Sequence, residues 1–397
     1  MKCRNCNIKL DNIVNFGKMP LANRFLKKNQ FKKEFFFKLR AAFCKKCFLF
    51  QLTESPKPQQ MFNRNYPFYS HTSNGMIAHF KKFFTFTKKF IGKNSKILEI
   101  GCNDGILLKN YKNFKHLGVE PSKNVANIAK KKFNLNVINN FFNLDLIENN
   151  KKLKDNYDLI ISANVICHIA DINNLAKAVS LSLKTGGAFV FEEPYLGDVI
   201  QKVSYDQIYD EHIFLFSLNS VKNIFKKFGL DLVDYKKQTT HGGSMRYILQ
   251  KNATKIPKKV LNALKIERQK GLCSVEKIKK FKLDCQKQKL FFVNNLKKIV
   301  KKYGKISAYG ATSKSTTILN YCNIDNKYID CIYDTTPDKI NKFSPGKHIP
   351  IVNHRKFHFK DHKIVILFAW NHLKEIQKKE IKFIVNGGRF IYHSSKI

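Results

Sequence analysis

Residues 97–107 constrain the fold of this chain more than any other stretch. They read Ile-Leu-Glu-Ile-Gly-Cys-Asn-Asp-Gly-Ile-Leu, an apolar strand that runs into a turn containing Gly101 and Gly105. Glycine permits a tight bend and a close approach of the backbone to a ligand. Asn103 stands where the Gly-x-Gly-x-x-Gly pattern has its middle glycine. We expect a helix after the turn, which makes this segment the first strand-turn-helix unit of an open α/β sheet.

Two following segments favour a nucleoside cofactor at this sheet. Residues 117–121 predict a second buried strand that ends in Glu120, whose carboxylate can accept hydrogen bonds from two ribose hydroxyls. A third strand over residues 135–138 precedes Phe142, a ring suited to stacking on adenine. The turn has no Lys-Ser/Thr pair, so a P-loop for nucleoside triphosphates is excluded.

Glu99 lies inside the first strand, two residues before Gly101. Its Glu-x-Gly-x-x-x-Gly context resembles the first motif of the S-adenosylmethionine (SAM) methyltransferases, which implies that Glu99 lies against the amino-acid half of SAM. A fourth strand begins at residue 158 and its carboxyl end delivers Asn164 and His168 to the crevice where open α/β sheets bind ligands. A fifth strand (188–194) and a terminal hairpin (230–235 and 245–250) complete the arrangement of a class I SAM methyltransferase, a Rossmann-like sheet of seven strands.

Composition limits the partners and the compartment. Lys and Arg number 73 and Asp and Glu 29, a net charge of +44, but the lysines lie along the whole chain among Asn, Ile and Phe. We interpret them as a coding bias, because nucleic-acid binding needs basic residues concentrated on one face. No apolar run reaches the roughly 18 residues that span a bilayer, and the N-terminus lacks the apolar core of a signal peptide. We therefore expect a cytoplasmic protein that binds no membrane.

Four of the ten cysteines form two CxxC pairs, Cys3 with Cys6 and Cys44 with Cys47. Four thiolates make a closed tetrahedral zinc site, which is structural because no position remains for water. A redox CxxC would occur once, in a thioredoxin-like context that is absent here. Residues 1–58 are therefore expected to form a small zinc-binding domain.

The remaining chain divides into three further parts. Residues 59–250 form the cofactor domain, and its first segment contains Tyr66 in a polar-aromatic bridge that either closes over a ligand or serves as packing. Residues 251–303 predict a helical connector with an apolar stripe. Residues 304–397 repeat the strand, glycine turn and helix pattern, with Lys314 at a helix start that suits an anion, and predict a second Rossmann-like α/β domain.

Tyr209, Glu211 and His212 place a phenol, a carboxylate and an imidazole within four residues. Histidine is the natural general base near neutral pH, and a neighbouring acid can orient it. Tyr209 and His168 can donate hydrogen bonds to a developing oxyanion. Proton abstraction beside a carbonyl requires this set of groups, although a surface cluster that caps the next helix remains the alternative.

At this point the sequence resembles a known family, the nucleotide-sugar C-methyltransferases, and within it the C-3-methyltransferases of D-tetronitrose biosynthesis. The resemblance runs from the first cysteine to the last strand, and its most specific block is Asp-Gln-Ile-Tyr-Asp-Glu-His at 206–212. The other matching segments are the four paired cysteines and residues 20–26, 99–105, 167–169, 192–198, 241–243, 309–312, 333–338 and 368–372.

The resemblance implies a reaction and a substrate. His212 would remove the C-3 proton of a 4-keto-6-deoxy sugar carried on a nucleoside diphosphate, and the enolate would take the methyl group of SAM with inversion. Tyr66, His168, Tyr209 and Glu211 would surround the sugar, and the zinc-binding and C-terminal domains would hold the nucleotide. Residues 69–71 (Tyr-Ser-His) depart from the pattern of the family, so contacts there are not carried over.

Two other readings compete with this one. A zinc-containing RNA methyltransferase would place clustered basic residues beside exposed aromatics. The second Rossmann-like domain and the Tyr-x-Glu-His set argue against it, so we expect no nucleic-acid partner. A SAM-binding scaffold without catalysis would lack the base or the donors, which are present. We expect a monomer.

Overall fold

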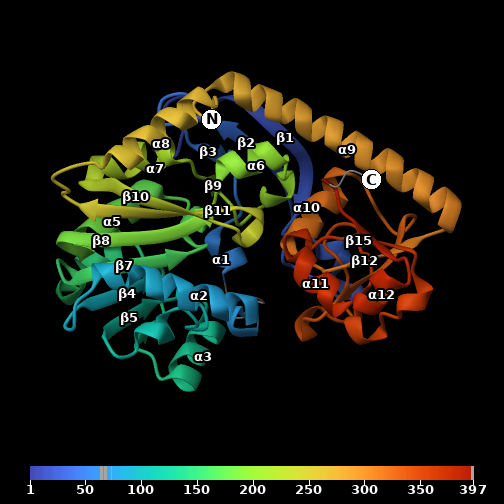
Figure 1. Ribbon diagram of the computed structural model, residues 1–397, viewed down its shortest axis with the longest axis horizontal. Helices are drawn as coiled ribbons and strands as arrows, with labels where there is room; N and C mark the ends of the chain where they lie inside the picture. Colours follow the sequence, from blue (N-terminus) through green and yellow to red (C-terminus); the bar gives the residue numbers. More distant parts are fainter. Residues whose placement is uncertain (63–65, 67–68, 73, 395–397) are drawn as a thin grey trace.

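Three β-sheets organise the chain in the computed structural model, which describes residues 1–62, 66, 69–72 and 74–394 (Figure 1). The first sheet has four strands and belongs mainly to the N-terminal region. The second has seven strands, and the third has five and lies toward the C-terminus. The predicted α/β fold with a small N-terminal four-cysteine unit and two successive α/β units is confirmed.

The four-stranded sheet is antiparallel and joins the N-terminal region to the middle of the chain. Its order is β1 (Asp11–Pro20), β2 (Phe36–Phe43), β3 (Phe50–Leu52) and β9 (Phe214–Leu215). The last strand comes from the segment that directly follows the Tyr-x-Glu-His set. The small N-terminal unit is therefore hydrogen-bonded to the chain beside the candidate site.

The seven-stranded sheet has the five parallel strands and the terminal antiparallel hairpin expected from the sequence. The order is β10-β11-β8-β7-β4-β5-β6, and only β11 runs antiparallel to its neighbours among the strands described. The strands are β4 (Lys96–Ile100), β5 (Lys115–Val119), β6 (Val137–Ile138), β7 (Tyr157–Ala163), β8 (Leu183–Pro194), β10 (Leu230–Gln238) and β11 (Ser244–Lys251).

Both faces of this sheet are buried, which explains why its strands are apolar at consecutive positions. On one face Ile97 packs with Phe80 and Phe83 of α2 (Asn74–Thr87), and on the other Leu98 joins the core that includes Leu175 of α5 (Ile172–Ser182). The other helices of this part are α1 (Pro58–Met61), α3 (Lys123–Phe133), α4 (Leu144–Glu148), α6 (Leu196–Lys202) and α7 (Leu218–Phe225).

The helix expected after the glycine turn of β4 is absent, and that prediction was wrong. A short 3-10 helix, Leu108–Tyr111, stands in its place. The side-chain amide of Asn110 donates to the carbonyls of Ile106 and Leu107, at 3.1 and 2.9 Å. These bonds satisfy backbone acceptors that a longer α-helix would have used, so nothing favours its continuation.

The C-terminal sheet is wholly parallel, in the order β14-β13-β12-β15-β16. Its first strand, β12, lies between β13 and β15, so the strand order reverses at the end of β12, where ligands bind in open α/β sheets. Its elements are β12 (Ile306–Tyr309), α10 (Ser313–Tyr321), β13 (Ile329–Asp334), β14 (Ile351–Asn353), β15 (Ile364–Leu367), α11 (Leu373–Lys379), α12 (Ile381–Val385) and β16 (Arg389–Ile391).

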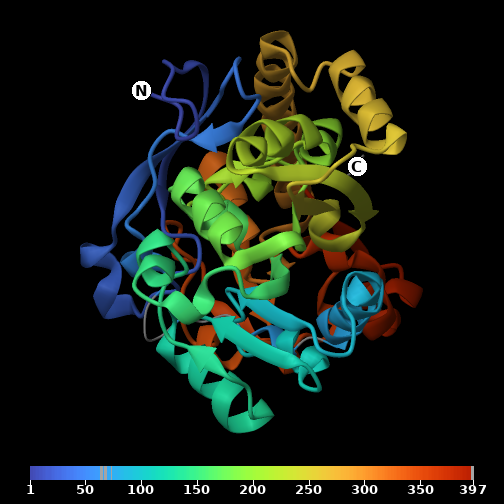
Figure 2. The same ribbon diagram turned by 90° about the vertical axis from the view of Figure 1, so that its left-hand side faces the viewer.

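Two helices connect the α/β units, α8 (Lys258–Gln269) and α9 (Val275–Tyr303). Helix α9 extends along one edge of the molecule from the seven-stranded unit to the five-stranded one, and Figure 2 shows the same molecule turned so that the seven-stranded unit faces the viewer. Phe281 of α9 is buried and meets the ring of Phe50 edge-on, so the connector packs against the N-terminal sheet as well. No helix in the described ranges is long and apolar enough to cross a membrane.

Candidate active site and metal centre

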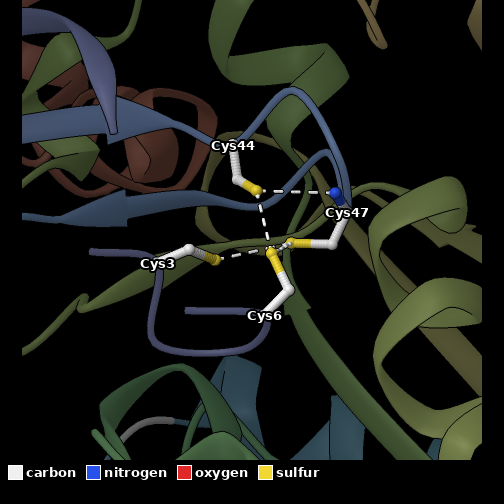
Figure 3. A group of neighbouring side chains, drawn as sticks. All are labelled: Cys3, Cys6, Cys44 and Cys47. Atoms are coloured by element: carbon white, nitrogen blue, oxygen red, sulfur yellow. Dashed lines mark hydrogen bonds between the residues drawn. The ribbon is translucent and has the colours of Figure 1, made fainter. Parts of the chain in front are cut away.

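The four paired cysteines converge on one point, as Figure 3 shows. Cys3 and Cys6 come from the N-terminal loop, and Cys44 and Cys47 from the turn between β2 and β3. The Sγ–Sγ distances are 3.6 Å for Cys3–Cys47, 3.3 Å for Cys6–Cys44 and 3.9 Å for Cys6–Cys47. Four thiolates at about 2.3 Å from a zinc ion would stand about 3.8 Å apart, so the cluster fits tetrahedral zinc.

Both halves of the cluster have the same backbone design. The N–H of Asn7 donates to the carbonyl of Cys3 at 2.9 Å, and the N–H of Phe48 donates to the carbonyl of Cys44 at 2.8 Å. Asn7 and Phe48 adopt positive φ values of 59° and 61°. The two turns therefore present their sulfur pairs in equivalent ways, and the site is structural because all four positions belong to the protein.

Three buried carboxylates surround the glycine turn after β4: Glu99, Asp104 and Glu120. The Glu120 carboxylate accepts the backbone N–H of Asn103 at 2.9 Å and that of Ser122 at 2.8 Å, which holds the turn against the end of β5. Burial raises the pKa of Glu99 well above its usual range, and the charges of Asp104 and Glu120 add to this effect. In the described part of the chain, Glu99 Oε2 and Asp104 Oδ1 are buried without a hydrogen-bond partner.

These carboxylates fit SAM, which carries an ammonium group, a sulfonium centre and two ribose hydroxyls. A buried carboxylate oxygen without a hydrogen-bond partner is costly, and a cation or hydroxyl donor removes that cost. Glu120 still has acceptor capacity beyond its two backbone bonds. The individual contacts assigned to Glu99, Glu120 and Asn103 stay predictions.

Gly101 and Gly105 are required by the protein's own packing. Both have positive φ, 67° and 83°. A Cβ on Gly101 would lie 2.5 Å from the methyl carbons of Val165, and one on Gly105 would lie 2.5 Å from Leu135 Cδ1. The space that the missing Cβ atoms leave is therefore filled by Val165, which follows β7, and by Leu135, which precedes β6. The close approach of a ligand to these two glycines stays a prediction.

Asn164 and Phe142 occupy different surroundings. Asn164 directly follows β7 with φ of 57°, and its N–H donates to the carbonyl of Glu192 at 2.8 Å. Its buried Oδ1 has no partner among the described residues, so it is available to a ligand. Phe142 is 5% exposed and packs in the main hydrophobic core. Its stacking on adenine stays a prediction.

The bridge before α2 is docked on the glycine turn. The backbone N–H and the ring Nδ1 of His71 lie 3.0 and 2.8 Å from Asp104 Oδ2. The Asn124 amide donates to the carbonyl of Tyr66 at 2.9 Å. Residues 63–65, 67, 68 and 73 of this bridge lie outside the described residues. The described part links the cofactor turn to Tyr66, which reaches the second half of the site.

His212 is buried and forms a hydrogen bond at each ring nitrogen. Its Nδ1 lies 2.8 Å from the carbonyl oxygen of Gln207, which can only accept, so Nδ1 carries the hydrogen. Nε2 therefore has a lone pair and lies 2.7 Å from the Tyr209 hydroxyl, which donates to it. The tautomer follows from this network, and it is the one that a general base requires.

The rings of Phe62, His168 and His212 form a stack. The centroid of the His168 ring lies 5.5 Å from that of His212 and 5.5 Å from that of Phe62, with interplanar angles of 25° and 14°. Burial lowers the pKa of His168 to about 4. Burial, followed by the effect of His168, lowers the pKa of His212 well below its usual value. Both imidazoles are therefore neutral near pH 7.

Glu211 does not orient His212, and that part of the prediction was wrong. Its carboxylate accepts the amide of Asn23 at 2.7 Å and the hydroxyl of Tyr66 at 3.4 Å. Consecutive residues in this turn point in different directions, so the Gln207 carbonyl takes the orienting role instead. Tyr66, Tyr209, Glu211, His168 and His212 nevertheless lie in one continuous network of hydrogen bonds and ring contacts.

Three residues of this network were not singled out from the sequence. Asn23 connects Glu211 to Ser313 of α10, whose hydroxyl donates to Asn23 Oδ1 at 2.9 Å. Gln207 orients the base through its backbone carbonyl, which no side-chain pattern reveals. Glu193 Oε1 accepts the N–H groups of residues 165, 166 and 167, at 2.9, 2.6 and 3.3 Å, and so fixes the turn that carries His168. Only the matching segments 20–26, 192–198 and 206–212 pointed toward these positions.

A cavity of about 400 Å³ opens beside Glu211, where the N-terminal, middle and C-terminal units meet. Its walls contain the cations Arg24, Lys339 and Lys342. The Lys339 ammonium donates to the carbonyl of Ala311 at 2.8 Å, and burial lowers its pKa. Lys314, which we had expected to face an anion, is buried with its ammonium 3.2 Å from Asn371 Oδ1.

Comparison with known proteins defines the class. Three domain models match the chain in succession: residues 3–62 match a "Putative zinc binding domain", residues 69–235 a methyltransferase domain, and residues 239–393 a C-methyltransferase C-terminal domain. Together with the seven-stranded sheet and the carboxylate-lined glycine turn, these matches make the protein a SAM-dependent C-methyltransferase.

The chain is similar to the C-methyltransferase NovU of Streptomyces niveus, with 28% identity over 401 residues, covering 98% of this chain and 94% of NovU. Among solved structures, a SAM-dependent methyltransferase from Archaeoglobus fulgidus aligns with 13% identity and a TM-score of 0.37, over 44% of this chain and 92% of its own. The YcgJ protein of Bacillus subtilis aligns with 13% identity and a TM-score of 0.37, over 44% and 99%.

Proposed function

We propose that the protein methylates C-3 of a 4-keto-6-deoxy sugar carried on a nucleoside diphosphate, through an enolate formed by His212. The observation that carries the proposal is the 2.8 Å contact between Nδ1 of His212 and the carbonyl oxygen of Gln207. Because this oxygen can only accept, Nδ1 carries the hydrogen of the neutral imidazole. This leaves the Nε2 lone pair to accept the C-3 proton. The choice of sugar rests on the sequence resemblance to the nucleotide-sugar C-methyltransferases.

The residues around His212 suit an enolate. When Nε2 takes the proton, the electrons of the C–H bond form the C-3 to C-4 double bond and the ketone oxygen becomes an oxyanion. The Tyr209 hydroxyl, 2.7 Å from Nε2 in the free site, is positioned to turn its donor toward that oxygen. His168 is a second donor beside it, because its Nε2 is buried and has no partner in the described ranges.

The cofactor is held by the other half of the site. Glu99, Asp104 and Glu120 would bind the ammonium and the ribose hydroxyls of SAM, with Asn164 at the facing strand end. SAM supplies an electrophilic methyl group to the enolate carbon. The chain's contribution is to hold a base and oxyanion donors in a buried, preorganised arrangement, in which electrostatic stabilisation is strongest.

The nucleotide would lie in the cavity between the three units. A volume of about 400 Å³ falls within the usual range for small-molecule sites. Arg24, Lys339 and Lys342 line it beside Asp210, Glu211 and Asp338, and a diphosphate would pair with the three cations. We infer a division in which residues 59–250 bind SAM, residues 1–58 and 304–397 hold the nucleotide, and residues 251–303 connect the units.

A direct assay tests the proposal. Purified protein and SAM are incubated in deuterated water with a panel of nucleoside-diphosphate 4-keto-6-deoxy sugars, and the products are read by mass spectrometry. A gain of one methyl group supports the function, and deuterium uptake beside the ketone without SAM supports enolisation before transfer. If neither signal appears with any sugar while the protein binds RNA tightly, the RNA methyltransferase reading replaces this one.

A further inference from the structure

Cys167, His168 and His212 form a second cluster of metal-ligating side chains, separate from the four paired cysteines. Their sulfur and imidazole nitrogen atoms all lie within 4.8 Å of one another. We propose that this cluster binds a Zn²⁺ ion and that the bound ion inhibits methyl transfer. The inhibitory part rests on the proposed function, whereas the binding part does not.

The ligand set suits zinc. One thiolate and two imidazoles are typical zinc ligands, and three protein ligands leave the fourth position open for water. In a tetrahedral zinc site such atoms stand about 3.3–3.6 Å apart. The cluster, with separations of up to 4.8 Å, would contract by at most about 1.5 Å, which side-chain rotation can supply.

The two histidines are prepared for this role in different ways. His212 donates its Nδ1 hydrogen to the Gln207 carbonyl, the same outer contact that orients most metal-bound histidines. His168 has its Nε2 buried without a partner in the part of the chain that the structure describes, and an ion would satisfy it. The cost of binding is the hydrogen bond between Tyr209 and Nε2 of His212, which the ion would replace.

The charges near the cluster are mixed. Glu193 accepts the backbone N–H of Cys167 at 3.3 Å, and the carboxylates of Glu193 and Glu211 both act on this thiol. Burial raises the pKa of both carboxylates, to about 7 for Glu193, so they favour a dication only in their ionised form. Lys314 acts on His212 and opposes the dication. We therefore expect a weaker site than the four-cysteine centre, one that fills only when zinc is in excess.

Binding at this cluster and proton abstraction exclude each other. A zinc ion bound to Nε2 of His212 uses the lone pair that would accept the sugar's proton. The ion would also occupy the space beside the Tyr209 hydroxyl. Inhibition should therefore be relieved by the sugar acceptor and not by SAM, because the carboxylates assigned to SAM are not among the ligands.

Zinc stoichiometry tests the binding part without any substrate. The full-length protein with its structural zinc is dialysed against increasing ZnCl₂, and bound zinc is measured. We expect two ions on the wild type and one on Cys167→Ser, because loss of a direct ligand should lower affinity by at least about 100-fold. Cys331→Ser, which removes a partly buried thiol outside the cluster, should still bind two.

The outcomes separate the two parts of the proposal. Cys167→Ala replaces the serine variant if the latter does not keep its structural zinc and its SAM binding. One zinc on the wild type, or two on both Cys167 variants, overturns the site. A second zinc that leaves methyl transfer unchanged overturns the inhibition. If no sugar is methylated at all, the proposed function fails while the stoichiometry still decides the site.

Discussion

Replacement of His212 by Asn isolates the chemical role of one nitrogen. The Asn side chain reaches the position of Nδ1, so its amide can still donate to the Gln207 carbonyl, which accepts at 2.8 Å in the native protein. It offers nothing at the position of Nε2, where the Tyr209 hydroxyl donates at 2.7 Å. The variant therefore keeps the orienting contact and loses the base.

The expected loss follows from the usual contribution of a general base. Such a group accelerates proton transfer by about 10²–10⁴-fold, so kcat should fall by that factor, a barrier increase of about 3–5 kcal/mol. SAM affinity should stay within about twofold, because Glu99 and Glu120 form a separate carboxylate cluster at the β4 turn. Thermal stability should fall only slightly, because one of the two hydrogen bonds is retained.

Single-turnover methyl transfer and calorimetric SAM binding measure the two quantities separately. His116→Asn is the matched control, since His116 lies on β5 and contacts the carbonyl of Phe114 at 3.0 Å, away from the cluster. Turnover of His212→Asn within about threefold of the wild type would refute the assignment of the base. An equal loss of SAM binding would show that the variant disturbs the whole site.

Four further predictions concern the base, the zinc centre, a buried ion pair and the SAM carboxylates. Burial and the neighbouring His168 lower the pKa of His212, and a general base acts in its neutral form, so kcat/KM should stay constant from about pH 8 to about pH 6.5 and decline only below that. A decline with a midpoint near pH 7 would contradict this prediction. Cys44→Ser should lose the structural zinc and lower the free energy of unfolding by several kcal/mol, measured by zinc content and thermal unfolding. Arg246→Met should cost up to about 3 kcal/mol in chemical denaturation, because the buried Glu192 carboxylate, 2.7 Å from the guanidinium, keeps only His79 and Thr240 as partners; an effect below about 1 kcal/mol would refute the role of the pair. Glu99→Gln should weaken SAM binding in calorimetry by about 10–100-fold with a smaller change in the KM of the sugar, and the reverse pattern would reassign this carboxylate.

The sequence predicted much of the fold because its signals are local. Apolar runs bounded by glycine turns marked β4, β12 and their neighbours, whereas the order of the strands within each sheet came from the structure. The paired cysteine spacing likewise predicted a metal centre, since two CxxC turns can only converge in a few ways. The helix predicted after β4 is absent because the Asn110 side chain donates to two carbonyls of its own turn, a local contact that the residue pattern does not reveal.

For the candidate site, too, the sequence predicted the residue types but not how they are arranged. Residue types sufficed to nominate His212, Tyr209, Glu211 and the carboxylates near the glycine turn. The direction of each side chain did not follow from them. Glu211 meets Asn23, which is 188 positions away in the chain, and the base is oriented by a backbone carbonyl.

The sequence by itself determined that the chain has one zinc-binding unit and two α/β units, and it determined the residue types that can carry the chemistry. These features follow from periodicity, turns and ligand spacing, which are encoded over a few residues. Only the tertiary structure decided how these units meet. Ala22 accepts the hydroxyl of Thr316 at 2.9 Å, and Ile208 accepts that of Thr317 at 3.1 Å, so α10 fastens the N-terminal segment to the turn that carries His212. Such contacts depend on the packing of surfaces distant in sequence, and packing is a property of the folded chain as a whole.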